Sequence, residues 1–322
     1  MRQNRNLFIS GKSAFKASGS LFLLAAIAVC LLNCRRESLP SGLGTLPEAD
    51  FNVIKSDANN VILVNNSSTP SIPYWTIVET GAQYKGDSAK IYLGFAYTYH
   101  IKMLITGKGG MDSTTKTFTI AANDPDLCAD GIVQGFLSGC TSRQWRLLQE
   151  ADALGVGPSE GDISWWSNTA DDVTTGRPCT FNDLFTFKMS GSLIPVNNFL
   201  YNDKGDYYTE DYMGPADGSC ADESTLTGAQ KAWGADTTDF AYQIIPNAGT
   251  HPDLGQLKLI GTGAHIALPK VQNEGQITTG PVSGTLIYNI ADTSHNAAGN
   301  AVLTLSIESP SGVWWLMKLS TN

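Results

Sequence analysis

Apolar and polar residues alternate in short runs along most of this chain, and turn-forming residues separate the runs. In residues 97–105, tyrosines and aliphatic side chains at odd positions alternate with Thr98, His100 and Lys102. Such alternation predicts strands with one buried face. In the last run, Val313, Trp315, Met317 and Leu319 share one face, so Trp315 is expected in a core and Trp314 on the opposite face.

The runs predict an all-β chain of two domains. Residues 50–122 hold short strands around Trp75 and Tyr99 and are expected to form a β-sandwich. Residues 123–322 are expected to form a larger, jelly-roll-like β-sandwich, with NDPD at 123–126 as the hinge. A short helix is a possibility only at Trp145–Leu154. Strands of the second domain are expected at Phe185–Met189, Asp239–Ile245, Gln256–Ile260, Thr285–Ile290, Val302–Ile307 and Val313–Leu319.

The N-terminus has the pattern of a bacterial lipoprotein export signal. Four basic residues precede an apolar run, Leu21–Leu32, which is shorter than the about 20 residues that cross a bilayer. Leu31-Leu32-Asn33-Cys34 then predicts cleavage of a signal peptide, residues 1–33, and lipidation of Cys34, with residues 34–49 as a tether. Asn33 departs from the small residue usual at that place, and an ordinary cleaved signal peptide is the alternative.

Charge argues against nucleic acid as a partner. Without residues 1–33 the chain keeps 17 basic against 30 acidic residues, a formal charge of −13. Phosphate contacts require a basic surface, which this composition does not supply.

Four cysteines remain after the signal and Cys34: Cys128, Cys140, Cys179 and Cys220. An even number in an exported chain predicts disulfides, and sequence order allows three sets of pairs. We favour Cys128–Cys140 and Cys179–Cys220, because each closes a local loop. The spacing lacks the Cys-x-x-Cys and histidine pairs of a zinc site.

The segment AYTYHIKMLITGKGGMDSTTKTFTI, residues 96–120, resembles the last two strands of a PKD-type immunoglobulin-like domain. Trp75 and Tyr99 stand where that family has its buried tryptophan and a tyrosine, and the resemblance covers about residues 51–121. The chain departs from the family at WTIVETG, where an acidic glycine-rich loop is usual. The resemblance implies a spacer domain.

Six segments of the second domain carry a further resemblance: RQWRLL (143–148), GVGP (155–158), ISWW (163–166), RPCTFNDLFTF (177–187), GTGAHIALPKVQN (261–273) and GVWWLMKL (312–319). In this order they resemble a module of exported Bacteroidota proteins. The module follows PKD-type domains in surface lipoproteins of polysaccharide utilisation and accompanies some family 16 β-glucanases. The resemblance implies a lipoprotein of the outer membrane, facing outside, that binds β-glucan of the laminarin kind beside a glycan transporter. Arg35-Arg36-Glu37 leaves a periplasmic orientation open.

Aromatic residues in polar, turn-rich surroundings are the candidate glycan-binding residues, because a sugar ring stacks on an aromatic face while polar side chains bind its hydroxyls. For each of them, packing into the core is the alternative. The candidates are Trp165, Trp166, Trp233, Tyr207 and Tyr212.

Signals of catalysis are weak, and no catalytic residue is assigned. Gly157–Gly161 matches the nucleophile-elbow pattern, but that turn needs a strand before it and a helix after it. Asp206 and Glu210 lie in a turn-rich segment and are expected to be solvated. No cofactor is expected, although Asp171-Asp172 and Asn123–Asp126 could bind a structural calcium ion. A glycan-degrading enzyme with an unrecognised site and a structural or adhesion lipoprotein remain the alternative functions.

Overall fold

The computed structural model describes residues 44–68, 70–194, 197–210, 218–234, 240–310 and 312–321. The chain divides into two compact units, Met1–Thr45 and Leu46–Asn322. The predicted signal peptide and Cys34 lie outside the described residues. Within the described ranges, no helix has the length and apolar character needed to cross a membrane.

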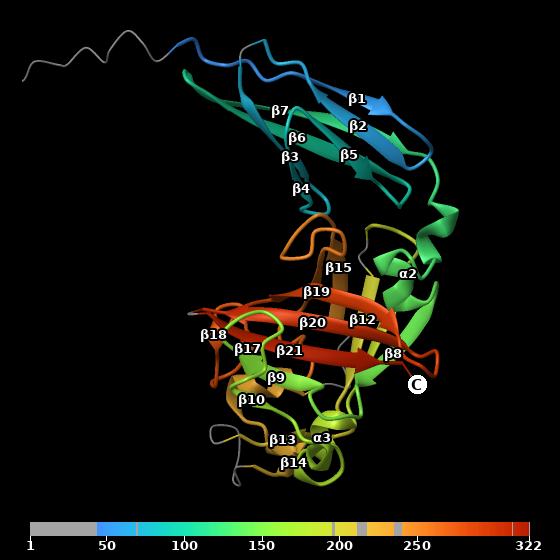
Figure 1. Ribbon diagram of the computed structural model, residues 1–322, viewed down its shortest axis with the longest axis vertical. Coiled ribbons are helices and arrows are strands. Elements are labelled where there is room, and N and C mark those ends of the chain that lie inside the picture. Colours follow the sequence, from blue (N-terminus) through green and yellow to red (C-terminus); the bar gives the residue numbers. More distant parts are fainter. Residues whose placement is uncertain are drawn as a thin grey trace, which may run out of the picture. The chain divides into compact units, whose positions relative to one another are not determined.

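Seven strands of the described residues form the N-terminal β-sandwich (Figure 1). One sheet has the order β1-β2-β5 and the other β4-β3-β6-β7, with antiparallel pairing throughout. The strands are β1 (Phe51–Lys55), β2 (Asn60–Asn65), β3 (Ile72–Ile77), β4 (Gln83–Lys85), β5 (Ser88–Tyr92), β6 (Tyr97–Gly107) and β7 (Gly110–Ile120).

The core of this sandwich follows the alternation in the sequence. In β6, Tyr99, Ile101, Met103 and Ile105 are buried while the residues between them are exposed, which confirms the predicted buried face. Trp75 is fully buried, and its indole Nε1 donates to the carbonyl oxygen of Gly86 at 2.8 Å. Trp75 and Tyr99 are therefore both core residues.

The Tyr99 hydroxyl donates to the backbone oxygen of Phe95, four residues upstream, at 3.0 Å. This bond fixes the turn before β6 and satisfies the hydroxyl of a ring that burial removes from water.

The second domain is built on eight strands, among the residues described, that pair antiparallel in chain order (Figure 1). The last strand, β21, also pairs with the first, β8, so the sheet closes into an eight-stranded, barrel-like sheet. The strands are β8 (Ser142–Leu147), β11 (Leu184–Lys188), β12 (Asn197–Asn202), β15 (Phe240–Ile245), β16 (Gln256–Ile260), β19 (Thr285–His295), β20 (Ala301–Ser309) and β21 (Val313–Ser320).

The all-β prediction is confirmed, and the larger domain has one closed sheet where two separate sheets were expected. The helix considered at Trp145–Leu154 is wrong, because Trp145 and Leu147 alternate with polar residues and form β8. Trp315 is buried on the inner face of β21, as predicted.

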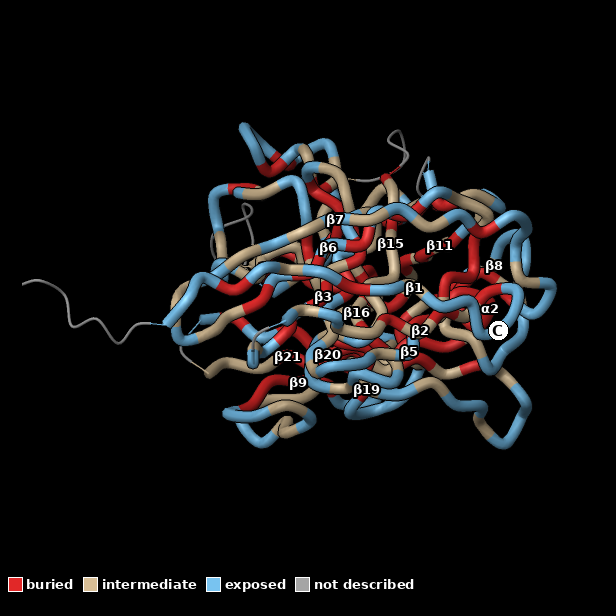
Figure 2. The backbone as a smooth tube through the Cα atoms, turned by 90° about the horizontal axis from the view of Figure 1, so that it is seen from above, coloured by how far each residue is buried: buried red, intermediate tan, exposed pale blue. Residues whose placement is uncertain are grey.

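Large side chains fill the inside of the closed sheet. An eight-stranded barrel has an interior just wide enough for side chains. Phe187 packs edge to face against Tyr242 with 5.0 Å between the ring centres, and Phe185 stacks on Tyr201 with 5.5 Å between the ring centres. Figure 2 shows buried positions concentrated in the strands and exposed positions in the connecting loops.

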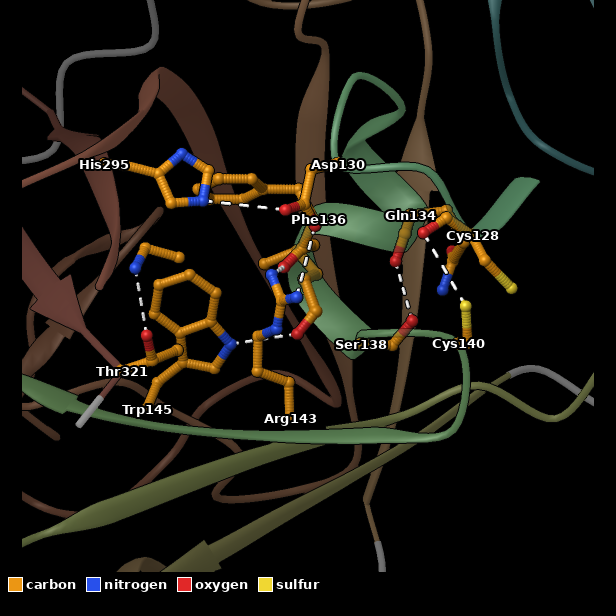
Figure 3. A network of polar contacts seen from close by, with 12 residues as sticks. Cys128, Asp130, Gln134, Phe136, Ser138, Cys140, Arg143, Trp145, His295 and Thr321 are labelled. Carbon is orange, nitrogen blue, oxygen red and sulfur yellow. Dashed lines mark hydrogen bonds and ion pairs between the residues drawn. The ribbon is translucent and has the colours of Figure 1, made fainter. Parts of the chain in front are cut away.

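Short helices accompany the sheet. The helix α2 (Val133–Ser138) is fixed to β8 by two side chains: Arg143 donates to the oxygen of Phe136 at 2.6 Å, and Trp145 Nε1 donates to the oxygen of Leu137 at 2.9 Å (Figure 3). The other short elements are η1 (Pro125–Cys128), η2 (Asp172–Gly176), α3 (Pro178–Phe181), η3 (Glu223–Thr225) and η4 (Gly228–Trp233), with strands β9 (Leu154–Gly157), β10 (Trp166–Ser167), β13 (Asp206–Tyr208), β14 (Cys220–Asp222), β17 (Val271–Gln272) and β18 (Gly275–Gln276).

One of the two favoured disulfides is present. Cys179 and Cys220 are bonded and join α3 to β14. Cys128 and Cys140 are free thiols, so the second favoured pair is not formed. The Cys140 thiol instead points at the carbonyl oxygen of Cys128, 3.7 Å away (Figure 3). A side-chain hydrogen bond between the two thiols raises the pKa of Cys128.

Replacing both Cys179 and Cys220 by Ala should lower the free energy of unfolding by about 4 kcal/mol, because the bond closes a loop between residues 41 apart. Denaturant unfolding under non-reducing conditions measures the loss. The matched control is Cys128→Ala with Cys140→Ala. If the control pair lowers the free energy of unfolding as much as the test pair, the Cys179–Cys220 disulfide is not the source of the stabilisation.

Candidate functional site

Strand β21 divides its edge between two partners. Trp314–Met317 pair with β9, whereas Leu319 and Ser320 pair with β8. The short strand β10 pairs with the outer side of β9 and forms the end of the sheet. Residues 154–167, called here the arm, therefore extend the sheet beside the closed barrel (Figure 1).

The loop of the arm lies against its own strand because β9 has glycine at two positions. A Cβ atom on Gly157 would come within 2.2 Å of the backbone oxygen of Asp162, and one on Gly155 within 2.4 Å of Ile163. The GVGP segment thus permits a close approach that any side chain would prevent.

Polar contacts hold the arm on the barrel. Glu160 accepts hydrogen bonds from Thr250, at 2.8 Å, and from Ser306 of β20. Asn168 is buried at the end of the arm, where its Oδ1 accepts from the backbone of Leu154 at 2.8 Å. The arm is anchored at its loop and at the start of its first strand.

The two tryptophans of the arm differ in their exposure to solvent. Trp166 lies opposite Val156, which lies opposite Trp315, so these three side chains share the inner face. The backbone N–H of Trp165 donates to the oxygen of Val156 at 3.1 Å, and its side chain is 56% exposed. Trp165 is open to solvent, as its predicted role requires.

Polar groups flank Trp165. The backbone and hydroxyl of Ser164 donate to Asp162, and these bonds lower the pKa of the Asp162 carboxyl, so it is ionised at neutral pH. In β21, two strands away, the half-buried Trp314 lies beside the exposed Glu308 of β20. An exposed ring with polar side chains next to it can stack a sugar and bind its hydroxyls.

Arg177 covers Trp166 on the inner side. Its guanidinium carbon lies 4.9 Å from the ring centre of Trp166 and 3.9 Å from that of Tyr208. One Nη of Arg177 lies 3.8 Å from Oε1 of Glu210. The cation is therefore bounded by two aromatic rings and one carboxylate.

Glu210 joins Arg177 to a second cation. Its Oε2 accepts a short hydrogen bond from Lys270, whose ammonium lies 5.6 Å from the ring centre of Trp315. The side chains of Glu210 and Lys270 are only 18% and 14% exposed. These residues form the Arg177 cluster: Trp166, Arg177, Tyr208, Glu210, Lys270 and Trp315.

Two of the predicted ligand residues are buried. Trp233 is 3% exposed and packs with Tyr207 and Leu226. The helix η4 turns Trp233 inward although its neighbours in the sequence are polar. Tyr207 alternates with the outward residues of β13, and its hydroxyl contacts Thr225 at 2.8 Å. The prediction that these rings are open is wrong, and Tyr212 lies outside the described residues.

The carboxylates considered for catalysis or calcium have other partners. Asp206 accepts from Asn182 at 3.2 Å, and Glu210 is bound by Lys270 rather than solvated as predicted. Asp172 accepts from Thr169 at 2.7 Å within its own turn. Within the part of the chain that the structure describes, no group of three His, Cys, Asp or Glu side chains is placed to hold a metal ion.

A buried polar pair behind α3 was not found from the sequence. Asp183 is 3% exposed and accepts from the Tyr201 hydroxyl at 3.3 Å, while its other carboxyl oxygen has no partner. Burial, together with the charge of Asp203, raises the pKa of Asp183 well above its usual value. Burial also lowers the pKa of the nearby His265 to about 4, so that ring is neutral.

Comparisons with known proteins give a partial likeness. No family model matches the chain, and no curated protein matches it. Among solved structures, the PKD1 domain of Vibrio anguillarum Epp is 22% identical, with 24% of this chain and 96% of that chain covered and a TM-score of 0.22. The PKD1 domain of the Vibrio cholerae metalloprotease PrtV is 19% identical, with 24% and 100% covered and the same TM-score.

Replacing Asp183 by Asn should stabilise the protein by roughly 1–3 kcal/mol at pH 7, since it removes a buried acid with an unpaired oxygen. The unfolded chain releases the Asp183 proton near pH 4 and the folded chain at higher pH. The contribution of Asp183 to the free energy of unfolding is therefore fully present below about pH 4. It is lost as the pH rises through the raised pKa of the folded state.

The gain from Asp183→Asn should accordingly grow between pH 4 and pH 7 in denaturant unfolding. Asp292→Asn, at an exposed position of β19, is the matched control and should change little. A gain that is constant with pH, or a variant less stable than wild type at pH 7, would contradict the assignment.

Proposed function

We propose that the chain is a non-catalytic, lipid-anchored protein that captures polysaccharide at the outer surface of the outer membrane. Trp165 carries the proposal. An indole more than half exposed on a well-anchored arm is a costly arrangement unless a ligand covers it, because tryptophan is usually buried. The face of a pyranose is a ligand that fits an exposed flat ring with polar residues beside it in the chain.

The surroundings of Trp165 fit a sugar better than an apolar ligand. Asp162 and Ser164 lie close to it in the sequence, and Glu308 lies beside Trp314 on the sheet that carries the arm. One ring stacked on a sugar contributes on the order of 1–3 kcal/mol, by analogy with bases on aromatic side chains. A single weak site of this kind suffices when many anchored copies bind one long polymer.

The remaining parts of the proposal rest on the sequence. Cys34 supplies the lipid anchor, residues 34–49 the tether and the N-terminal sandwich the spacer. The second domain resembles modules of polysaccharide utilisation. On that resemblance we propose β-glucan, of the laminarin kind, as the polymer and a glycan transporter as a partner.

Trp165→Ala should weaken glycan binding by about tenfold or more while leaving stability within about 0.5 kcal/mol, because the ring is exposed. Gel retardation and calorimetry of residues 35–322 against β-glucans and other glycans measure the affinity. Tyr74→Ala is the matched control, since Tyr74 is also an exposed ring, 40% exposed, but lies in the N-terminal sandwich.

An equal loss of glycan affinity in both variants, or no loss in Trp165→Ala, would show that Trp165 is not part of the binding site. Failure to bind any glycan in the panel would contradict the function as a whole. Release of reducing sugar from the panel would favour the hydrolytic alternative.

A further inference from the structure

We propose that Arg177, together with Lys270, binds a carboxylate carried by the glycan, so that the protein selects polymers containing uronic acid. The inference rests on the proposed glycan-binding function and specifies its substrate class. It differs from the neutral β-glucan that the sequence resemblance suggests.

Arg177 has donors that no described residue of the chain uses. Its side chain makes no hydrogen bond with another residue in the described part of the chain, and its one ion pair, to Glu210, spans 3.8 Å, longer than a hydrogen bond. The guanidinium nevertheless lies against the rings of Trp166 and Tyr208, which restrain it. Aromatic faces contact the plane of the cation, while its N–H groups lie at the edge of that plane.

A planar carboxylate is the ligand that suits such an edge. Arginine and carboxylate form paired, parallel hydrogen bonds, and these charge-assisted bonds are stronger than neutral ones. Because the two rings already fix the guanidinium, little conformational entropy is lost when the anion binds. The side chain is 19% exposed, so it is accessible and yet partly removed from water.

The charges within the Arg177 cluster favour an anion. Arg177 and Lys270 are two cations, and among the described residues Glu210 is the one carboxylate paired with either of them. The cluster therefore has an excess positive charge, in a chain whose net charge without residues 1–33 is −13. An anionic group would restore the balance.

The position of Trp166 connects this cluster to the glycan surface. Arg177 covers a face of Trp166, so that face is closed to a sugar ring, and we assign Trp166 to holding Arg177. Trp165 directly precedes β10, the strand at the end of the sheet, and is exposed. A glycan chain that stacks on Trp165 can pass around this edge and bring an acidic sugar to Arg177.

The test uses a matched pair of ligands and three single variants. The ligands are an oligosaccharide containing glucuronate and its carboxyl-reduced counterpart, which differ only in charge. Calorimetry should show that wild type binds the acidic form at least about tenfold more tightly, with the difference shrinking at high salt. Arg177→Gln should abolish this preference.

Glu210→Gln is the decisive variant. It removes the carboxylate that competes with the ligand and should strengthen binding of the acidic form, whereas a merely structural Glu210 would weaken or not change it. Lys188→Gln, at an exposed lysine of β11, removes the same charge as Arg177→Gln elsewhere and should leave the preference intact. Thermal midpoints of all variants identify any loss caused by unfolding.

The outcomes separate the two claims. Equal binding of both ligands by wild type overturns the inference and leaves glycan binding standing. A preference that survives Arg177→Gln, or is not increased by Glu210→Gln, also overturns it. Absence of binding to any glycan overturns the proposed function, and this inference with it.

Discussion

The candidate site depends on how one strand divides its hydrogen bonds. The edge of β21 pairs with β9 along Trp314–Met317 and with β8 only at its end. The barrel-like sheet therefore closes through a short contact, and the rest of the edge is free to carry the arm. Backbone hydrogen bonds in a sheet fix both direction and register, so this division places Trp166 on the inner face, while Trp165, just before β10, is exposed.

Segments distant in the sequence complete the site around that arm. Arg177 directly follows η2, and Lys270 directly precedes β17. Tyr208 is the last residue of β13, and Glu210 lies two residues after it. The Cys179–Cys220 bond joins the helix after Arg177 to the strand that pairs with Tyr208. The disulfide and the ring contacts thus restrain the same region, and the arm contributes the only tryptophan of the described residues with more than half of its surface exposed.

Local alternation in the sequence predicted the all-β class, the buried face of β6 and the inward position of Trp315. These features depend only on the two-residue repeat of a strand. It did not predict the β21–β8 pairing, which joins the first and last strands of the sheet. Trp233 was misplaced because polar neighbours do not show which way a short helix turns a ring. The Arg177 cluster was missed because ion pairs between residues 33 and 60 apart leave no pattern in the sequence.

Hydrogen–deuterium exchange with and without a bound glycan tests most directly whether the arm carries the binding surface. The account predicts that a glycan slows exchange in residues 154–167 and in the first half of β21, since the ligand covers Trp165 and the strand that supports it. Slower exchange confined to the N-terminal sandwich, or unchanged exchange in the arm at saturating glycan, would contradict it.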